Sequence, residues 1–262
     1  MRRKRYFQQS HPTRKQICAV SSVLLAALFF VIATPLYIVN ARTQSVAGNR
    51  LLPIYSVEKE EKVLAISFDC AWGADYTDEL LKHMENHNVR CTFFAVEFWV
   101  KRYPQYAKKI VDAGHELGTH SRSHPYMSKL TEAQIQDELT TSSNAIEEAT
   151  GIRPTLFRPP YGDYNNTLIS TATAMGLYTI QWDVDSLDWK NLSATEIALR
   201  VINRAKNGSI ILCHNNGLHT AEALPLIFST LQNKGYTFVP IGELIYKDNY
   251  TLDVTGKQHP AS

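Results

Sequence analysis

The chain has 262 residues, of which 44% are hydrophobic and 20% charged, with 27 Lys and Arg against 25 Asp and Glu. It is long enough to bury one large core with some chain left over. Six of the basic residues lie at positions 1–16, so 21 Lys and Arg face 25 Asp and Glu in the rest of the chain. The remainder is therefore acidic, which argues against nucleic acid as a partner.

The amino-terminal part predicts a membrane anchor. Residues 17–39 are 23 positions without an ionised side chain, and residues 1–16 before them are basic. A helix of that length rises about 34 Å, enough to cross a hydrocarbon core of about 30 Å. The positive-inside bias then keeps 1–16 in the cytoplasm, makes 17–39 a single-pass signal-anchor helix in the cell membrane and places the rest outside the cytoplasm. The alternative is a secreted domain released after signal cleavage near residues 45–47, where small side chains suit a peptidase.

The segment 62–246 predicts one α/β domain, between a tether at 40–61 and a polar tail at 247–262. Apolar runs suited to strands lie at 63–68, 91–96, 115–120, 155–157, 177–182, 209–213 and 236–239. Helical patterns lie at 77–86, 104–113, 131–150, 165–175, 193–205 and 221–234, and capping boxes open those at 131 and 193. About seven strands separated by helices predict a parallel sheet with helices outside it, closed or nearly closed into a barrel.

Residues able to do chemistry gather where these strands end. In barrels of this kind the carboxyl ends of the strands meet at one rim. His120 and His124 are two imidazoles four positions apart that can hold one metal ion, and a catalytic zinc needs a third protein ligand and an open position for water. The alternative is a chance pair on a solvated loop. The other strand ends bring further polar side chains to the same rim: Asp69, Arg158, Tyr161, Asp185, Asp188 and His214.

Five motifs in this order resemble the polysaccharide deacetylase family, also called the NodB-homology domain or carbohydrate esterase family 4. They are Ser-Phe-Asp, Gly-Thr-His-x-x-x-His, Arg-Pro-Pro-Tyr, Asp-x-x-Asp-Trp and Leu-x-His, and they span about residues 62–244. The resemblance implies a distorted (β/α)7 barrel, zinc or another divalent metal, and hydrolysis of N-acetyl groups on a cell-wall polysaccharide, peptidoglycan rather than chitin. The anchored amino terminus and the Phe-Asp-x-Ala-Trp-Gly motif resemble the sporulation-associated, membrane-anchored branch.

The resemblance also implies roles in catalysis. Asp69 matches the family's base, His214 its general acid, and Asp188 the carboxylate that orients the acid. The backbone N–H of Tyr161 matches the oxyanion donor. Without the other motifs, His214 after an apolar strand is more often a satisfied core histidine, and Asp188 could be a turn carboxylate.

The pocket residues follow in the same way. Trp189 and Leu212 match the wall around the acetyl methyl group. Arg158 is expected to pair with a carboxylate of the rim, either Asp69 or Asp185.

The first motif departs from the family pattern at Cys70. Most members carry two aspartates there, the base and the third metal ligand. A thiolate is a good zinc ligand, so Cys70 with His120 and His124 is one hypothesis for the metal site. The alternatives are a metal held by two histidines and water, recruitment of Asp75, or no metal at all.

The sequence therefore supports two alternative functions. The retained acid, base and orienting carboxylate favour a metal-dependent N-deacetylase, a hydrolase of non-peptide carbon–nitrogen bonds. Cys70 favours a carbohydrate-binding relative with weak or absent catalysis. An amidase acting on small cyclic amides could use the same barrel, but the predicted anchor argues against it.

Overall fold

The computed structural model describes residues 50–261, and Leu51–Ser262 forms one compact unit. The membrane helix expected at 17–39 lies outside the described residues. Among the helices within 50–261, none is long and apolar enough to cross a membrane.

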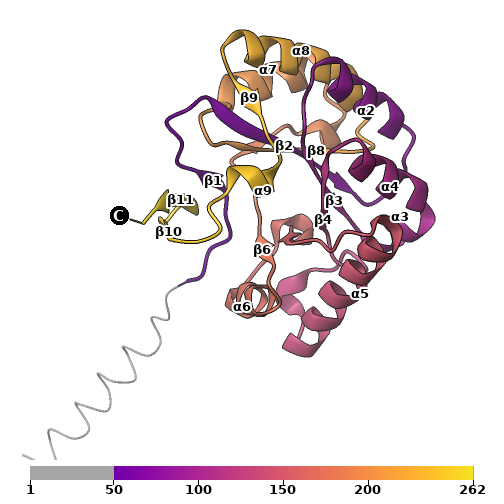
Figure 1. Cartoon of the computed structure of the whole chain (residues 1–262), viewed down its shortest axis with the longest axis vertical. Helices are drawn as coiled ribbons and strands as arrows, with labels where there is room; N and C mark the ends of the chain where they lie inside the picture. The colour runs from indigo at the N-terminus through magenta and orange to yellow at the C-terminus, as the bar shows by residue number, and fades with distance from the viewer. Residues whose placement is uncertain (1–49, 262) are drawn as a thin grey trace, which may run out of the picture. The chain divides into compact units, whose positions relative to one another are not determined.

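A parallel sheet forms the centre of the unit (Figure 1). In order across the sheet its strands are β6 (Tyr178–Thr179), β5 (Leu156–Phe157), β4 (Glu116–Thr119), β3 (Thr92–Ala95), β2 (Val63–Cys70), β8 (Ile210–His214) and β7 (Val184–Asp185). A further strand, β9 (Thr237–Phe238), pairs with the first residues of β2. The α/β prediction and its parallel sheet are confirmed. The sheet ends at β6 and β7 among the described strands, so the architecture is a half-barrel rather than a hydrogen-bonded (β/α)7 ring.

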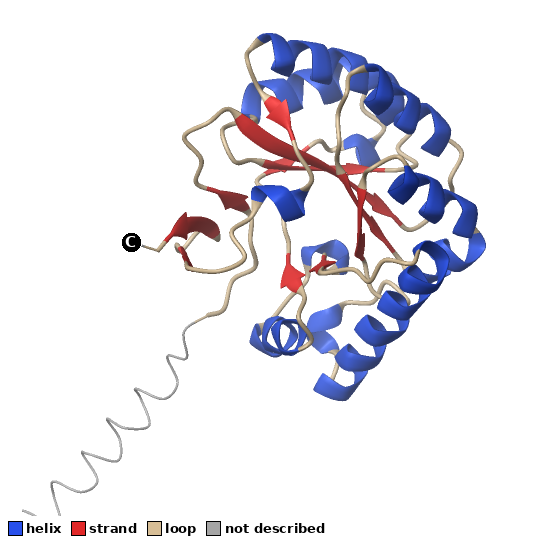
Figure 2. Ribbon diagram, viewed as in Figure 1, coloured by secondary structure: helices blue, strands red, loops and turns tan. Residues whose placement is uncertain are grey.

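Helices lie along the outer side of the strands (Figure 2). They are α2 (Thr77–Asn86), α3 (Glu97–Arg102), α4 (Pro104–Asp112), α5 (Glu132–Thr150), α6 (Asn166–Ala174), α7 (Ala194–Arg204) and α8 (Thr220–Asn233). The short α9 (Ile241–Leu244) lies on the other face of the sheet, where it packs against Ala65 and Phe94. The capping boxes predicted for α5 and α7 are present, and Gly151 ends α5 in the left-handed conformation, with φ of 76°. The described part of the chain also contains three 3-10 turns, η1 (Met127–Lys129), η2 (Pro160–Gly162) and η3 (Asp188–Lys190).

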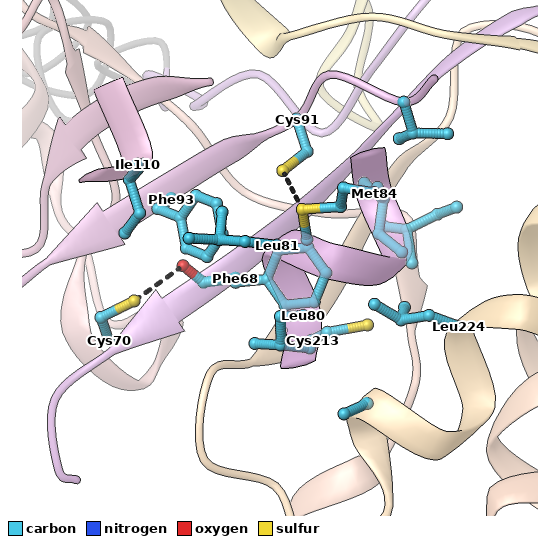
Figure 3. Close-up of a cluster of buried hydrophobic side chains, with 14 of the residues drawn as sticks. Phe68, Cys70, Leu80, Leu81, Met84, Cys91, Phe93, Ile110, Cys213 and Leu224 are labelled. Carbon is cyan, nitrogen blue, oxygen red and sulfur yellow. Dashed lines mark hydrogen bonds between the residues drawn. The ribbon is translucent and has the colours of Figure 1, made fainter. Parts of the chain in front are cut away.

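The central strand β2 runs two residues further than the sequence predicts. Backbone pairing continues to its last residue, where Cys70 lies opposite Ala95 of β3. Successive side chains of a strand point to opposite faces. Phe68 and Cys70 therefore join the apolar cluster between sheet and helices (Figure 3). Asp69 points to the other face, where it pairs with Arg158.

A second, smaller sheet corrects the prediction for both ends of the domain. Its strands are β1 (Ser56–Val57), β11 (Lys257–Pro260) and β10 (Tyr250–Leu252). The expected polar tail thus contains two strands, and the expected tether contains one. These short segments become strands because β1 and β11 pair across about 200 residues of sequence, a contact that local periodicity does not show. Val57 is fully buried there.

Candidate active site

The rim of the half-barrel brings together side chains from four strand ends. Asp69 on β2 lies in register with His214 on β8, the neighbouring strand. His120 follows β4, and Arg158 follows β5, which pairs with β4. Parallel strands place their carboxyl ends on one edge, so residues up to 145 positions apart become neighbours.

A buried ion pair occupies the floor of this rim. The Asp69 carboxylate accepts a hydrogen bond from Arg158 Nη1 at 2.8 Å, and the Arg158 side chain is fully buried, with its guanidinium over the Phe94 ring. Burial opposes the ionised form of Asp69, but the Arg158 charge outweighs it, and the pKa of Asp69 lies below its ordinary value. Asp69 is therefore ionised. Of the two partners left open by the sequence for Arg158, the structure places Asp69 against it.

The two histidines lie against this ion pair. His120 Nδ1 donates to the Arg158 carbonyl oxygen at 2.7 Å, which leaves its Nε2 lone pair 3.5 Å from Asp69 Oδ2. The rings of His120 and His124 are 4.9 Å apart between centroids. Burial lowers the pKa of both, that of His124 to about 4, so both imidazoles are in the neutral form that binds metals. The buried Nδ1 of His124 has no hydrogen-bond partner within the described residues.

Cys70 does not complete a metal site with them. Its side chain is fully buried beside Phe68 and Phe93, and its Sγ lies 3.8 Å from the Phe68 carbonyl oxygen (Figure 3). Burial, and then the Asp69 charge, raise the pKa of the thiol well above its ordinary value, so it is not the thiolate that ligates zinc. Within residues 50–261 no group of three His, Cys, Asp or Glu side chains is arranged to hold a metal ion. The two imidazoles are suited to bind a metal ion, but Cys70, the third ligand in the cysteine hypothesis, is not placed to bind it.

The remaining alternative ligand is Asp75, which is solvent-exposed. Its backbone N–H donates to Asn216 Oδ1 at 3.1 Å, in the loop that follows β2. The structure does not bring its carboxylate into a metal-binding group with the histidine pair.

A second buried acid holds the third histidine. Both carboxylate oxygens of Asp188 contact His214, one at 2.7 Å from ring Nδ1 and the other at 2.7 Å from the backbone N–H. Burial opposes a charged imidazole, but the hydrogen bond to Asp188 outweighs it and raises the pKa of His214. A histidine with a raised pKa and a side chain one-third exposed can donate a proton to a leaving group at the rim.

The pocket residues divide into exposed and buried ones. Trp189 and Tyr161 are both more than half exposed, and Tyr161 has a left-handed backbone, with φ of 59°. Leu212 is buried on β8. Asp185 ends β7, and its Oδ1 accepts a hydrogen bond from the Leu187 N–H at 2.8 Å. It is therefore not the carboxylate that pairs with Arg158.

Two exposed aromatic residues at this rim carried no role in the sequence prediction. The Trp72 ring meets the edge of the His124 ring at 5.0 Å, and Tyr126 stacks on Tyr161 at 4.4 Å. Tyr161 in turn contacts His124 at 4.5 Å. The signal for Trp72 in the sequence is its place in the Phe-Asp-x-Ala-Trp-Gly motif, three residues after Asp69.

Known proteins match this chain along most of the folded unit. The family model described as polysaccharide deacetylase matches residues 56–180. A peptidoglycan-N-acetylglucosamine deacetylase of Bacillus cereus is 33% identical over 196 residues, which cover 73% of this chain and 92% of that protein. This chain belongs to the polysaccharide deacetylase family.

Other relatives include a protein named as uncharacterized and one named as a pseudoenzyme. The uncharacterized protein YlxY of Bacillus subtilis is 35% identical over 74% of this chain, which spans only 60% of YlxY. BA3943 of Bacillus anthracis, named a pseudoenzyme of carbohydrate esterase family 4, is 35% identical with a TM-score of 0.71, over 74% of this chain and 68% of that one. A BA3943 mutant with a TM-score of 0.71 is described as having restored enzymatic activity.

Membership in the polysaccharide deacetylase family indicates a general reaction class. Its enzymes are hydrolases of carbon–nitrogen bonds and generally need a metal. The position of the Cys70 thiol therefore bears on whether this chain can hold such a metal.

Proposed function

We propose that this chain binds an N-acetylated cell-wall glycan, peptidoglycan rather than chitin, at the half-barrel rim, and that it hydrolyses the acetamido group weakly or not at all. The observation that carries the proposal is the Cys70 side chain, which is neutral and packed in the apolar cluster on the face opposite Asp69. Among the described residues, the histidine pair then has no third protein ligand of the kind that zinc hydrolases use.

The binding half of this proposal rests on the exposed rim. Trp189 and Tyr161 offer aromatic faces to solvent beside the polar groups of Asp69 and His214, a combination suited to sugar rings and their hydroxyl and acetamido groups. Several relatives are named peptidoglycan deacetylases, which supports peptidoglycan as the ligand. BA3943, a pseudoenzyme by name, supports loss of catalysis within this fold.

A second candidate function is active metal-dependent deacetylation, favoured by the Asp188–His214 pair. In that case Asp69 takes a proton from the attacking water, and His214 gives one to the amine as the carbon–nitrogen bond breaks, yielding acetate. Asp188 holds the imidazole in orientation, and the Tyr161 N–H would meet the oxyanion. A bound metal would polarise the water, with His120 and His124 as its available ligands.

The experiment compares the full chain with Cys70→Asp. It measures zinc stoichiometry, binding of N-acetylglucosamine oligomers by calorimetry, and acetate release; Cys70→Asp with Asp69→Asn is the matched control. The proposal expects the native chain to bind oligomers without releasing acetate above that control. Zinc binding and acetate release by Cys70→Asp are expected only if the new carboxylate leaves the apolar cluster and turns to the histidine pair.

Two outcomes separate the candidates. Acetate release by the native chain at the rate of Cys70→Asp supports the active deacetylase instead. If the native chain binds no oligomer and releases no acetate, both glycan functions fail for this chain.

Location remains a proposal of its own. The basic segment at 1–16 and the apolar run at 17–39 support a single-pass anchor that holds the domain outside the cytoplasm, next to the cell wall. The first-motif sequence supports a link to sporulation. Protease protection in spheroplasts tests the placement: an external domain is digested from outside, and a cytoplasmic one is protected.

A further inference from the structure

The loop between His120 and His124 has an unusual backbone. Ser121 and His124 both have positive φ angles, 74° and 59°, a backbone conformation that residues other than glycine rarely adopt. Such a conformation persists only where the surroundings fix it. The contacts of residues 121–124 show what fixes it here.

Hydroxyl groups within the same segment satisfy the two ends of the loop. The Ser121 N–H donates to Thr119 Oγ1 at 3.2 Å, and the His124 N–H donates to Ser121 Oγ at 3.0 Å. The Ser121 carbonyl accepts from the backbone N–H of Glu97, the first residue of α3. The backbone N–H groups of Arg122 and Ser123, in the middle of the loop, need other acceptors.

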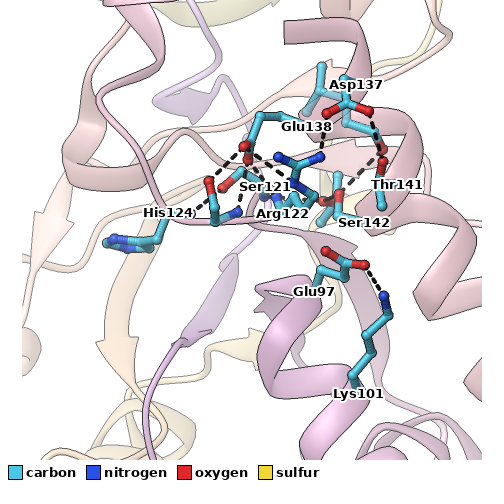
Figure 4. A network of polar contacts seen from close by, with 12 residues as sticks. Glu97, Lys101, Ser121, Arg122, His124, Asp137, Glu138, Thr141 and Ser142 are labelled. Carbon is cyan, nitrogen blue, oxygen red and sulfur yellow. Dashed lines mark hydrogen bonds and ion pairs between the residues drawn. The ribbon is translucent and has the colours of Figure 1, made fainter. Parts of the chain in front are cut away.

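One carboxylate on α5 satisfies both of them. Oε2 of Glu138 accepts from the N–H of Arg122 and from the N–H of Ser123, each at 2.9 Å. Its other oxygen accepts from Ser123 Oγ at 2.6 Å. The same oxygen lies 3.7 Å from Arg122 Nε, and Figure 4 shows Glu138 beside Arg122. Glu138 is almost fully buried, so its carboxylate makes hydrogen bonds to the loop in place of hydrogen bonds to water.

We propose that Glu138 is a positioning residue that sets the spacing of the His120 and His124 imidazoles by fixing the loop between them. His120 is held independently, through its ring bond to the Arg158 carbonyl, whereas His124 Nδ1 has no partner in the described part of the chain. The His124 ring is therefore placed by its backbone and by ring contacts with Trp72 and Tyr161, without a hydrogen bond, and Glu138 holds the two residues just before it. Hydrogen bonds to a charged carboxylate are stronger than neutral ones, which suits this task.

The neighbouring residue on the same helix offers a matched control. Asp137 is exposed and contacts the loop only through the Arg122 guanidinium. Removing its charge leaves every backbone N–H of the loop with its partner. Asp137→Asn and Glu138→Gln thus make the same chemical change at adjacent positions.

The test uses the full chain without added metal or glycan, so it stands or fails separately from the proposed function. Amide hydrogen exchange and the nuclear Overhauser effect between the two imidazoles are measured for the native chain, Glu138→Ala, Glu138→Gln and Asp137→Asn. With Glu138→Ala we expect exchange at Arg122 and Ser123 to be at least about tenfold faster, and the inter-ring effect to weaken.

The controls decide between positioning and general stabilisation. Asp137→Asn should leave both readouts at their native values, and Glu138→Gln, which keeps one acceptor oxygen, should fall between native and Glu138→Ala. The proposal is overturned if the loop amides stay protected in Glu138→Ala and Glu138→Gln, or if exchange accelerates equally across α5 and β4. If Glu138→Ala does not fold, Glu138→Gln carries the same comparison.

Discussion

Asp188 holds His214 at two points, the ring Nδ1 and the backbone N–H, with one carboxylate oxygen 2.7 Å from each. Thr220 Oγ1, at the start of α8, donates to one of the same oxygens at 2.7 Å. The carboxylate is buried and fully engaged, so its charge acts mainly on this imidazole. The pair is built to keep a proton on His214.

Asp188→Asn should lower the pKa of His214. The native pKa lies above the ordinary value, so the pair stabilises the fold fully below the unfolded-state pKa, and this contribution is lost as pH rises through the folded-state pKa. The gap in unfolding free energy between native and Asp188→Asn should therefore narrow toward alkaline pH. An NMR titration of His214 gives the pKa, with Asp185→Asn as a control that shifts it less. An unchanged titration in Asp188→Asn would contradict the assignment.

How far the sequence predicts this site depends on which contacts are local. The helix ends follow from nearby residues: Thr131 with Gln134 opens α5 with the predicted capping box, and the helix ends at Thr150, its predicted last residue, before Gly151. The side to which Cys70 points depends instead on whether β2 continues past Phe68, which its pairing with β3 decides. The Glu138 contacts to the histidine loop likewise require α5 to be packed against β4.

Arg158→Leu should destabilise the fold by about 3–5 kcal/mol, because it leaves the buried Asp69 carboxylate without its partner. The pKa of Asp69 should rise for the same reason. Chemical denaturation of the native chain, Arg158→Leu, Asp69→Asn and the double variant measures the coupling. The double variant should lose less than the two single losses added together, and additive losses would mean that the pair does not interact.

Cys70→Asp should be less stable than the native chain by about 3 kcal/mol in the presence of a chelator, because it introduces a carboxyl group into the cluster of Phe68 and Phe93. Zinc at a hundredfold excess over its Kd should return about 2.7 kcal/mol if the new carboxylate joins the histidine pair. Cys70→Ala, which loses about 1 kcal/mol, should not respond to zinc. Equal stability of Cys70→Asp and native without metal would show that position 70 does not lie in the apolar cluster.

His115 should make the fold sensitive to mild acid. It is buried against Phe93 and Cys91, and burial, followed by the Arg90 charge, lowers its pKa to about 4. The folded state then binds its proton less readily than the unfolded state, whose pKa is about 6.5, so stability falls as pH drops from about 6.5 to 4. The loss attributable to this residue is about 3 kcal/mol at pH 4. His115→Asn should flatten the dependence of unfolding free energy on pH in that range. A slope identical to the native one would assign the acid sensitivity to other groups, of which His124, with a pKa also lowered to about 4, is the first to test.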